Sequence, residues 1–260
     1  MEDVNVNQQP SLVKKVLTYF GYILIAFIAV GVIAHFVWKN SGSGEWEFLH
    51  EIDGIKVYTM KEPGRVLEKY KVIGRFQAKL GPIMKVMRDP AACDEVGCYN
   101  SYIIKTEEYP RLVYYTFTYP LPEPFLPREY VVLSEYKQDP ISKEIYVDFR
   151  TVDNVLPESD CCVRVTQMHN KWQFFPKEDG IVEVQFTMDH DPAGNLPYFM
   201  VNADMRDMIH TNIPDLQAVL DLPNYKDAVV DYVLEVGDDP SKLEAFKSQL
   251  SEITSEKTSS

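Results

Sequence analysis

Two histidines are the residues of this chain best suited to general acid–base chemistry. His169 and His190 lie near the ends of predicted strands, and an imidazole is the side chain that most often moves protons near neutral pH. Neither has a nucleophile at a motif spacing, and the sequence contains no GxSxG, no HExxH and no phosphate-binding loop. An enzyme is therefore an alternative that requires the fold to place a base in a cavity.

The four cysteines offer redox or metal chemistry, and their spacing argues against a metal. Cys93, Cys98, Cys161 and Cys162 form no CxxC pair, and no histidine cluster accompanies them, so a zinc site is not expected. Cys93 and Cys98 can close a small loop in an oxidising compartment. Cys161 and Cys162 are adjacent on a predicted strand, so their side chains are expected to point to opposite faces. Buried free thiols are the alternative for all four. We expect neither a metal nor a cofactor.

Apolar side chains recur on one face of several predicted strands, and such faces together can surround a hydrophobic guest. The alternation is clearest in segments 111–119, 144–151 and 181–189. The last predicted helix adds Met205, Met208 and Ile209 to the apolar positions. Methionine suits a wall that adapts to a flexible guest, but a filled core produces the same alternation. The pattern by itself therefore leaves a cavity and a packed core both open.

The order of the predicted elements decides how these faces meet. Trp46–Ile52 has the apolar spacing of a brief helix, and Asp53-Gly54 is a turn signal. Strands are predicted at Ile55–Lys61, Glu68–Phe76, Tyr99–Thr106, Arg111–Tyr119, Arg128–Tyr136, Glu144–Thr151, Cys161–Phe175 and Ile181–Asp189, and short helices at Leu80–Arg88 and Ala91–Val96. Consecutive strands on short connections indicate antiparallel pairing.

A long amphipathic helix ends this order of elements. Pro197–Leu220 carries apolar or small residues at steps of three and four, with a kink expected at Pro214. The prediction is an α+β helix-grip fold, in which a curved antiparallel sheet buries one face around a long C-terminal helix.

An uncharged run of 23 residues, Val16–Trp38, precedes this domain. About 20 apolar residues cross a bilayer as a helix, and aromatic residues crowd both ends of the run, as expected at membrane interfaces. We expect a single-pass anchor. A cleavable signal peptide is the alternative, although its apolar core is usually shorter. Two lysines before the run against one after it favour a cytosolic N-terminus, which in a bacterium puts the domain in the periplasm.

Charge and composition restrict the partners and divide the chain. The net charge of −13 disfavours long-range attraction to nucleic acid or to anionic lipid. The expected parts are a tail over 1–15, the anchor over 16–38, a short flexible Ser-Gly linker over 39–44, one domain over 45–237 and a polar tail over 238–260, disordered at its end.

Three segments of the domain resemble a known family. Leu126-Pro127-Arg128-Glu129-Tyr130 looks like a Pro-Arg-Asp-aromatic strand entry, with Glu129 in place of the usual acid. Cys162-Val163-Arg164, followed by Trp172 and Pro176, is similar to a Val-Arg strand that runs on to a Trp and a Pro. Asp191–Pro197, continuing to Asn202, resembles the Asp-x-x-Gly-x-Leu-Pro turn before the last helix. Together, over nearly all of 45–239, they resemble the START domain, the lipid-transfer fold related to steroidogenic acute regulatory protein.

The resemblance implies a hydrophobic tunnel that holds one lipid and is gated by the last helix and by a loop. In this chain the gate loop is Pro120–Pro127, with Leu121, Phe125 and Leu126 at its tip. Some sterol-binding relatives hold a buried Arg–acid pair on the two flanking strands, which here carry charges only at or near their ends. That departure favours a neutral or weakly polar guest, read by Tyr115, Ser134 or Asn202. Arg128 and Arg164 are interpreted as structural.

The site and function expected from these arguments are specific. The cavity-lining residues are Val113, Tyr115, Phe117, Ser134, Val147, Phe149, Val184, Phe186, Asn202, Met205 and Ile209. We expect a non-enzymatic protein that binds one hydrophobic lipid, such as a sterol or phospholipid, and carries or senses it at a membrane. A helix-grip enzyme of cyclase or hydrolase type, or a membrane-tethered adaptor with a filled cavity, are the alternatives.

Overall fold

The computed structural model describes residues 12–246 and 248. Its strands are β1 Glu47–Ile52, β2 Ile55–Met60, β3 Lys69–Gln77, β4 Tyr99–Glu107, β5 Leu112–Tyr119, β6 Arg128–Gln138, β7 Ile145–Thr151, β8 Val163–Val165, β9 Gln167–Pro176 and β10 Ile181–Asp191. Its helices are α1 Leu12–Asn40, α2 Leu80–Arg88, α3 Ala92–Glu95, α4 Tyr198–Met208 and α5 Asn212–Leu220, with 3₁₀ turns η1 Glu178–Gly180 and η2 Ile209–Thr211.

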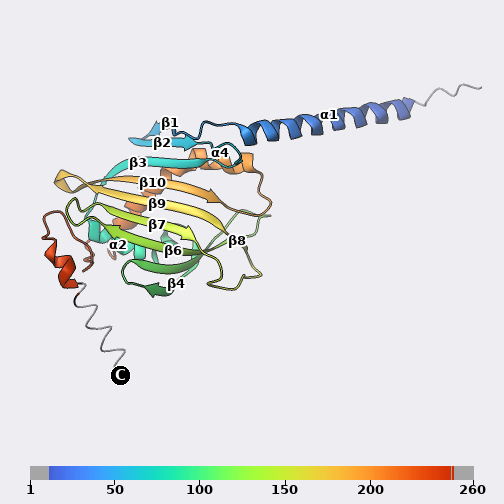
Figure 1. Cartoon of the computed structure of the whole chain (residues 1–260). Helices are drawn as coiled ribbons and strands as arrows, with labels where there is room; N and C mark the ends of the chain where they lie inside the picture. The colour runs from blue at the N-terminus through green and yellow to red at the C-terminus, as the bar shows by residue number, and fades with distance from the viewer. Residues whose placement is uncertain (1–11, 247, 249–260) are drawn as a thin grey trace, which may run out of the picture.

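One curved sheet dominates the domain, with α2 and α4 behind it (Figure 1). The strand order is β1-β2-β3-β10-β9-β7-β6-β5-β4, and every neighbouring pair in it is antiparallel. The short strand β8 pairs with β6 in parallel. The predicted α+β helix-grip architecture is confirmed: the sheet buries one face and the C-terminal helices cover it.

The core lies where α5 meets the middle of the sheet. Ile213 and Leu220 of α5 are 3% exposed and pack in one cluster with Val184 and Phe174. Burying each such side chain stabilises the fold by about 1.5–3 kcal/mol. The sheet makes room for the helix at Gly74, where a Cβ would lie 2.8 Å from Cδ1 of Ile213. A glycine at this point of β3 therefore allows the close approach.

The helix predicted at Trp46–Ile52 is wrong, because the segment is strand β1. It pairs with β2 through Glu47–Thr59 to Ile52–Ile55, so the partner strand supplies the hydrogen bonds that a six-residue helix would supply poorly. Asp53 and Gly54 have φ of 52° and 78°, the left-handed values of a two-residue hairpin turn. An Asp-Gly turn of this kind requires strands on both sides.

The long C-terminal helix is broken in two. The break is η2, which ends three residues before Pro214. Proline has no N–H to donate to the carbonyl of residue 210, and its ring crowds that carbonyl, so the chain tightens there before α5 continues. The single strand predicted over Cys161–Phe175 is also divided, since β8 pairs with β6 and β9 pairs with β7 and β10.

The junction between α1 and the domain is hydrogen-bonded, which differs from the flexible linker expected over 39–44. The buried Lys61 ammonium donates to the carbonyls of Lys39 and Ser41, each at 3.3 Å, and to that of Arg65. The indole N–H of Trp38 donates to the carbonyl of Val66 at 2.8 Å. These bonds connect the end of α1 to the loop before β3, and α1 leaves the domain beside α4 (Figure 1).

The segment after α5 closes the opposite end of the domain. The Glu235 carboxylate accepts from the amides of Leu80 and Gly81 at 3.0 and 2.7 Å, which satisfies free N–H groups at the start of α2. Residues 241–246 are helical, and Phe246 packs on Tyr232. The rest of the predicted tails, residues 1–11, 247 and 249–260, lies outside the described residues.

Candidate functional site

A cavity of about 570 Å³ lies between the sheet and the helices that cover it. Its wall is mainly apolar and comes from β5, β6, β7, β9 and β10 on one side and from α2, α3, α4 and α5 on the other. Volumes of roughly 300–1,000 Å³ are usual for small-molecule sites. The arrangement can shelter an apolar guest from water.

Most of the residues predicted to line a cavity border it. They are Tyr115, Phe117, Phe149, Phe186, Asn202, Met205 and Ile209, together with Leu121 of the gate loop. The strand alternation placed Tyr115, Phe117, Phe149 and Phe186 on the covered face of the sheet.

Four of the predicted residues, Val113, Ser134, Val147 and Val184, do not border the cavity. Each is at most 1% exposed, and Val147 and Val184 pack in the same cluster as Leu220 and Tyr232. Alternation gives the correct face for all four, but α5 and the segment after it fill the space beside Val147 and Val184. These four residues belong to the packed core.

The gate loop is fixed by Arg128, which is buried and borders the cavity. Its guanidinium donates to the carbonyls of Pro192 at 2.6 Å, Leu126 at 2.5 Å and Ala193 at 3.1 Å. Phe125 and Leu126 are 36% and 55% exposed and are not part of the cavity wall. Arg128 thus connects the gate loop to the turn before α4.

Arg164 has a comparable structural role on β8. It donates to the Glu129 carboxylate at 2.9 and 2.7 Å and to the carbonyls of Leu156 and Pro157. Beside it, Cys161 and Cys162 form a disulfide, and a second disulfide joins Cys93 and Cys98. The described residues contain no group of three or more His, Cys, Asp or Glu able to hold a metal ion.

The polar groups expected to read a guest are engaged elsewhere or buried. The Tyr115 hydroxyl donates to the carbonyl of Arg88 at 3.2 Å. The Asn202 amide accepts from the backbone N–H of Glu68 at 3.1 Å and donates to the carbonyl of Val66 at 2.9 Å. Ser134 lies in the core. Asn202 therefore holds the segment before β3 against α4.

An ion pair between the buried Glu68 and the partly exposed Arg206 closes the same region. Glu68, 4% exposed, borders the cavity and accepts hydrogen bonds from Arg206 of α4 and from the hydroxyl of Tyr70 at 2.8 Å. The Glu68 carboxylate beside Arg206 raises the pKa of that guanidinium, and burial raises the pKa of Tyr70. The acid is fully partnered, so its charge stabilises the contact between α4 and the sheet.

Among the polar residues of the cavity wall that sequence reasoning missed are Tyr130, Asn170 and, as a binding residue, His190. The hydroxyl of Tyr130 lies 3.0 Å from Nε2 of His190, and burial lowers the pKa of His190 to about 4. His169, the other candidate base, faces solvent and contacts Asp148 at 2.6 Å. Extending the alternation of Val184, Phe186 and Met188 by one step would have found His190.

No family model matches this chain, but solved structures do. It superposes on a STAR-related lipid transfer protein from Xanthomonas axonopodis with a TM-score of 0.62 and 24% identity, over 69% of this chain and 100% of that one. The fold is that of the START domain. Human STARD10 gives a TM-score of 0.63 at 16% identity, over 73% and 78% of the two chains. Human StAR-related lipid transfer protein 5 gives 0.57 at 16% identity, over 77% and 96%.

A curated relative adds a bacterial sequence. The chain is 22% identical over 185 residues to an uncharacterized protein of Pseudomonas aeruginosa, covering 70% of this chain and 89% of the relative. Among the described residues, α1 is the one helix long and apolar enough to cross a membrane, by length and composition.

Proposed function

We propose that this chain is a membrane-anchored START-like domain that binds one hydrophobic lipid and carries or senses it at the membrane surface. The observation that carries the proposal is the cavity of about 570 Å³ under α4 and α5. Each CH₂ of a lipid chain costs about 0.8 kcal/mol in water, and an apolar cavity removes that cost. Two of the START structures described above are lipid transfer proteins by name, which supports the same activity.

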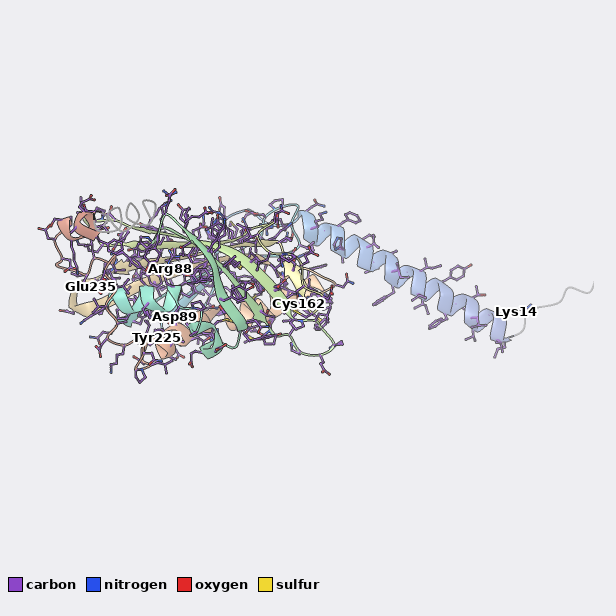
Figure 2. All side chains as sticks on the ribbon, turned by 90° about the horizontal axis from the view of Figure 1, so that it is seen from below. Lys14, Arg88, Asp89, Cys162, Tyr225 and Glu235 are labelled. Carbon is purple, nitrogen blue, oxygen red and sulfur yellow. A yellow bond between two sulfur atoms is a disulfide. The ribbon has the colours of Figure 1, made fainter. Side chains whose placement is uncertain are left out.

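The position of α1 supports action on the membrane that holds the anchor. Figure 2 shows Cys162 at the end of the domain from which α1 leaves and Glu235 at the other end. Cys162 directly precedes β8. The gate loop lies at the first end, because Arg128 pairs with Val163. The gate loop and the turn before α4 then face the bilayer, as does the end of the cavity that Leu121, Pro192 and Leu196 border.

Lipid analysis of the full chain tests the proposal. The protein is purified from its membrane with mild detergent, and native mass spectrometry is followed by extraction and identification of bound lipid. We expect near one-to-one retention of one lipid class. Met205→Trp, which fills the cavity, should lower retention at least about tenfold, because a lipid and an indole cannot share the space. Met200→Trp is the matched control, since Met200 lies on the same helix, 51% exposed and outside the cavity wall.

Two outcomes would contradict the carrier. If Met205→Trp lowers lipid retention no more than Met200→Trp does, the retained lipid lies on the surface of α1 and not in the cavity. A lipid-free protein after exposure to liposomes would favour a tethered adaptor. For the orientation of the chain, we propose that the domain lies in the periplasm. Accessibility of the domain to protease in intact spheroplasts tests this orientation.

A further inference from the structure

Five charged side chains border the cavity, and their signs restrict the head of any guest. Four are acids, Glu68, Asp89, Asp204 and Asp215, and the fifth is Arg128. The Arg128 guanidinium is already bonded to three backbone carbonyls, and Glu68 is paired with Arg206. A phosphate or carboxylate head would therefore find no available cation in the cavity wall, which is costly in a partly desolvated site.

Neutral hydrogen-bonding groups occupy the sheet side of the same cavity. Tyr130 of β6 and His190 of β10 are in contact at 3.0 Å. Asn170 of β9 pairs with Met188, whereas His190 pairs with Met168, so Asn170 and His190 are diagonal neighbours on one face of the sheet. The backbones of such neighbours are about 7–8 Å apart, and long or aromatic side chains reach across this distance.

One atom of this group has no partner within the described part of the chain. Oδ1 of Asn170 is buried and accepts no hydrogen bond, although Asn170 borders the cavity. A buried acceptor without a donor costs about 1–3 kcal/mol. Asn202 also borders the cavity and was expected to contact the guest, but its side-chain oxygen and nitrogen both have hydrogen-bond partners. The free acceptor at Asn170 calls for a donor on the guest.

We propose that Tyr130, Asn170 and His190 form a subsite for the hydroxyl of an uncharged lipid alcohol. The lipid hydroxyl donates to Oδ1 of Asn170 and accepts from the Tyr130 hydroxyl, which itself accepts from the Nε2–H of His190. The apolar body lies along Phe149, Phe186 and Met205. This inference rests on the proposed function and names the class of lipid. It favours lipids with a donor on the head over anionic lipids and over lipids whose head has no donor.

Photo-crosslinking of the full chain in liposomes tests this subsite. Three probes carry the same diazirine-labelled acyl chains: a diacylglycerol, its phosphate (phosphatidic acid) and the methyl ether of its hydroxyl. Labelling of peptides from β5 to α5 is quantified by mass spectrometry. We expect the alcohol to label the cavity about tenfold more than the ether or the phosphate, since one unsatisfied buried acceptor is worth about a factor of ten or more.

Variants locate the effect. Asn170→Leu and Tyr130→Phe should lower labelling by the alcohol to the level of the ether and leave labelling by the ether unchanged. Gln173→Leu is the matched control, because Gln173 is a second amide on β9 that faces outward and bonds Gln185. It should leave all three probes unchanged. Near-ultraviolet circular dichroism verifies that each variant is folded.

The outcomes separate this inference from the proposed function. Cavity labelling that is equal for alcohol and ether, or that Asn170→Leu does not change, would overturn the subsite and leave lipid binding intact. Preferential labelling by the phosphate would overturn the argument from charge. If no probe labels the cavity, the proposed function fails and the subsite fails with it.

Discussion

At the scale of single residues, His190 couples the cavity to pH. Burial lowers its pKa to about 4, against an unfolded value of about 6.5. Between pH 6.5 and pH 4 the imidazole of His190 takes up a proton in the unfolded chain but not in the folded chain. The contribution of His190 to stability is therefore complete above pH 6.5 and is lost as the pH falls through 6.5 toward 4. The loss reaches at most about 3 kcal/mol.

Urea unfolding of the full chain at pH 7.5 and 4.5 measures this effect. Wild-type protein should lose more stability between the two values than His190→Gln, which has no proton to gain. His169→Gln is the matched control, since His169 is exposed on the outer face, and it should follow the wild type. An identical pH dependence for His190→Gln and wild type would show that the coupling is absent.

At the scale of elements, Lys61 decides how α1 is joined to the domain. Its ammonium is held by backbone carbonyls and lies 5.2 Å from the ring centroid of Trp38, and burial lowers its pKa. Gly42 packs so closely on Lys61 that a Cβ would lie 2.1 Å from the Lys61 carbonyl oxygen. The junction therefore orients the domain relative to the anchor.

Removing the ammonium should loosen this junction. In Lys61→Met, the carbonyl of Ser41 loses the ammonium donor and that of Lys39 keeps only the amide of Gly64, at a cost of about 1–3 kcal/mol. Hydrogen exchange at the amides of Gly44 and Gly64, which bond Lys61 and Lys39, should accelerate about tenfold or more. Lys56→Met, an exposed change on β2, provides the comparison. Unchanged exchange in Lys61→Met would mean that Trp38 alone holds the junction.

At the scale of the whole molecule, one end of the domain lies beside α1, and the proposed function has this end face the membrane. Exposed apolar residues gather there: Leu126 in the gate loop and Phe199 and Met200 at the start of α4. At the start of α4 the ring centroids of Tyr198 and of His35 in α1 are 5.6 Å apart. Ile141 is 86% exposed but lies beyond the far end of β6, which is about 36 Å long. Under the proposed function the two ends therefore differ in distance from the bilayer and not in hydrophobicity.

An environment-sensitive fluorophore distinguishes the two ends. It is attached through a non-natural residue at position 126, 199 or 141 of the full chain in liposomes. We expect blue-shifted emission at 126 and 199 and the emission of water at 141, because apolar side chains near a bilayer enter it. Equal emission at 126 and 141 would place the gate loop away from the membrane.

The sequence predicted the sheet and its covered face well, and the site only in part. Alternation on β5, β7 and β10 selected Tyr115, Phe149 and Phe186, which border the cavity. The same alternation could not separate them from Val147 and Val184, because the period of a strand gives a side chain its face and not its neighbour across the core. The brief helix assigned before Asp53 failed because strand pairing with β2 outweighed local spacing.

Local chemistry is what the sequence by itself determined: an apolar run that suits an anchor, strand periodicity, the turns that separate the strands, and the motifs that match the START fold. Tertiary structure decided the rest. It placed the Lys61 ammonium at the end of α1 and bonded Asn202 and Tyr115 to the backbone. It left Oδ1 of Asn170 without a partner among the described residues, on the cavity wall that Tyr130 and His190 also form. These outcomes depend on pairs far apart in the chain, and only packing determines which polar groups find partners.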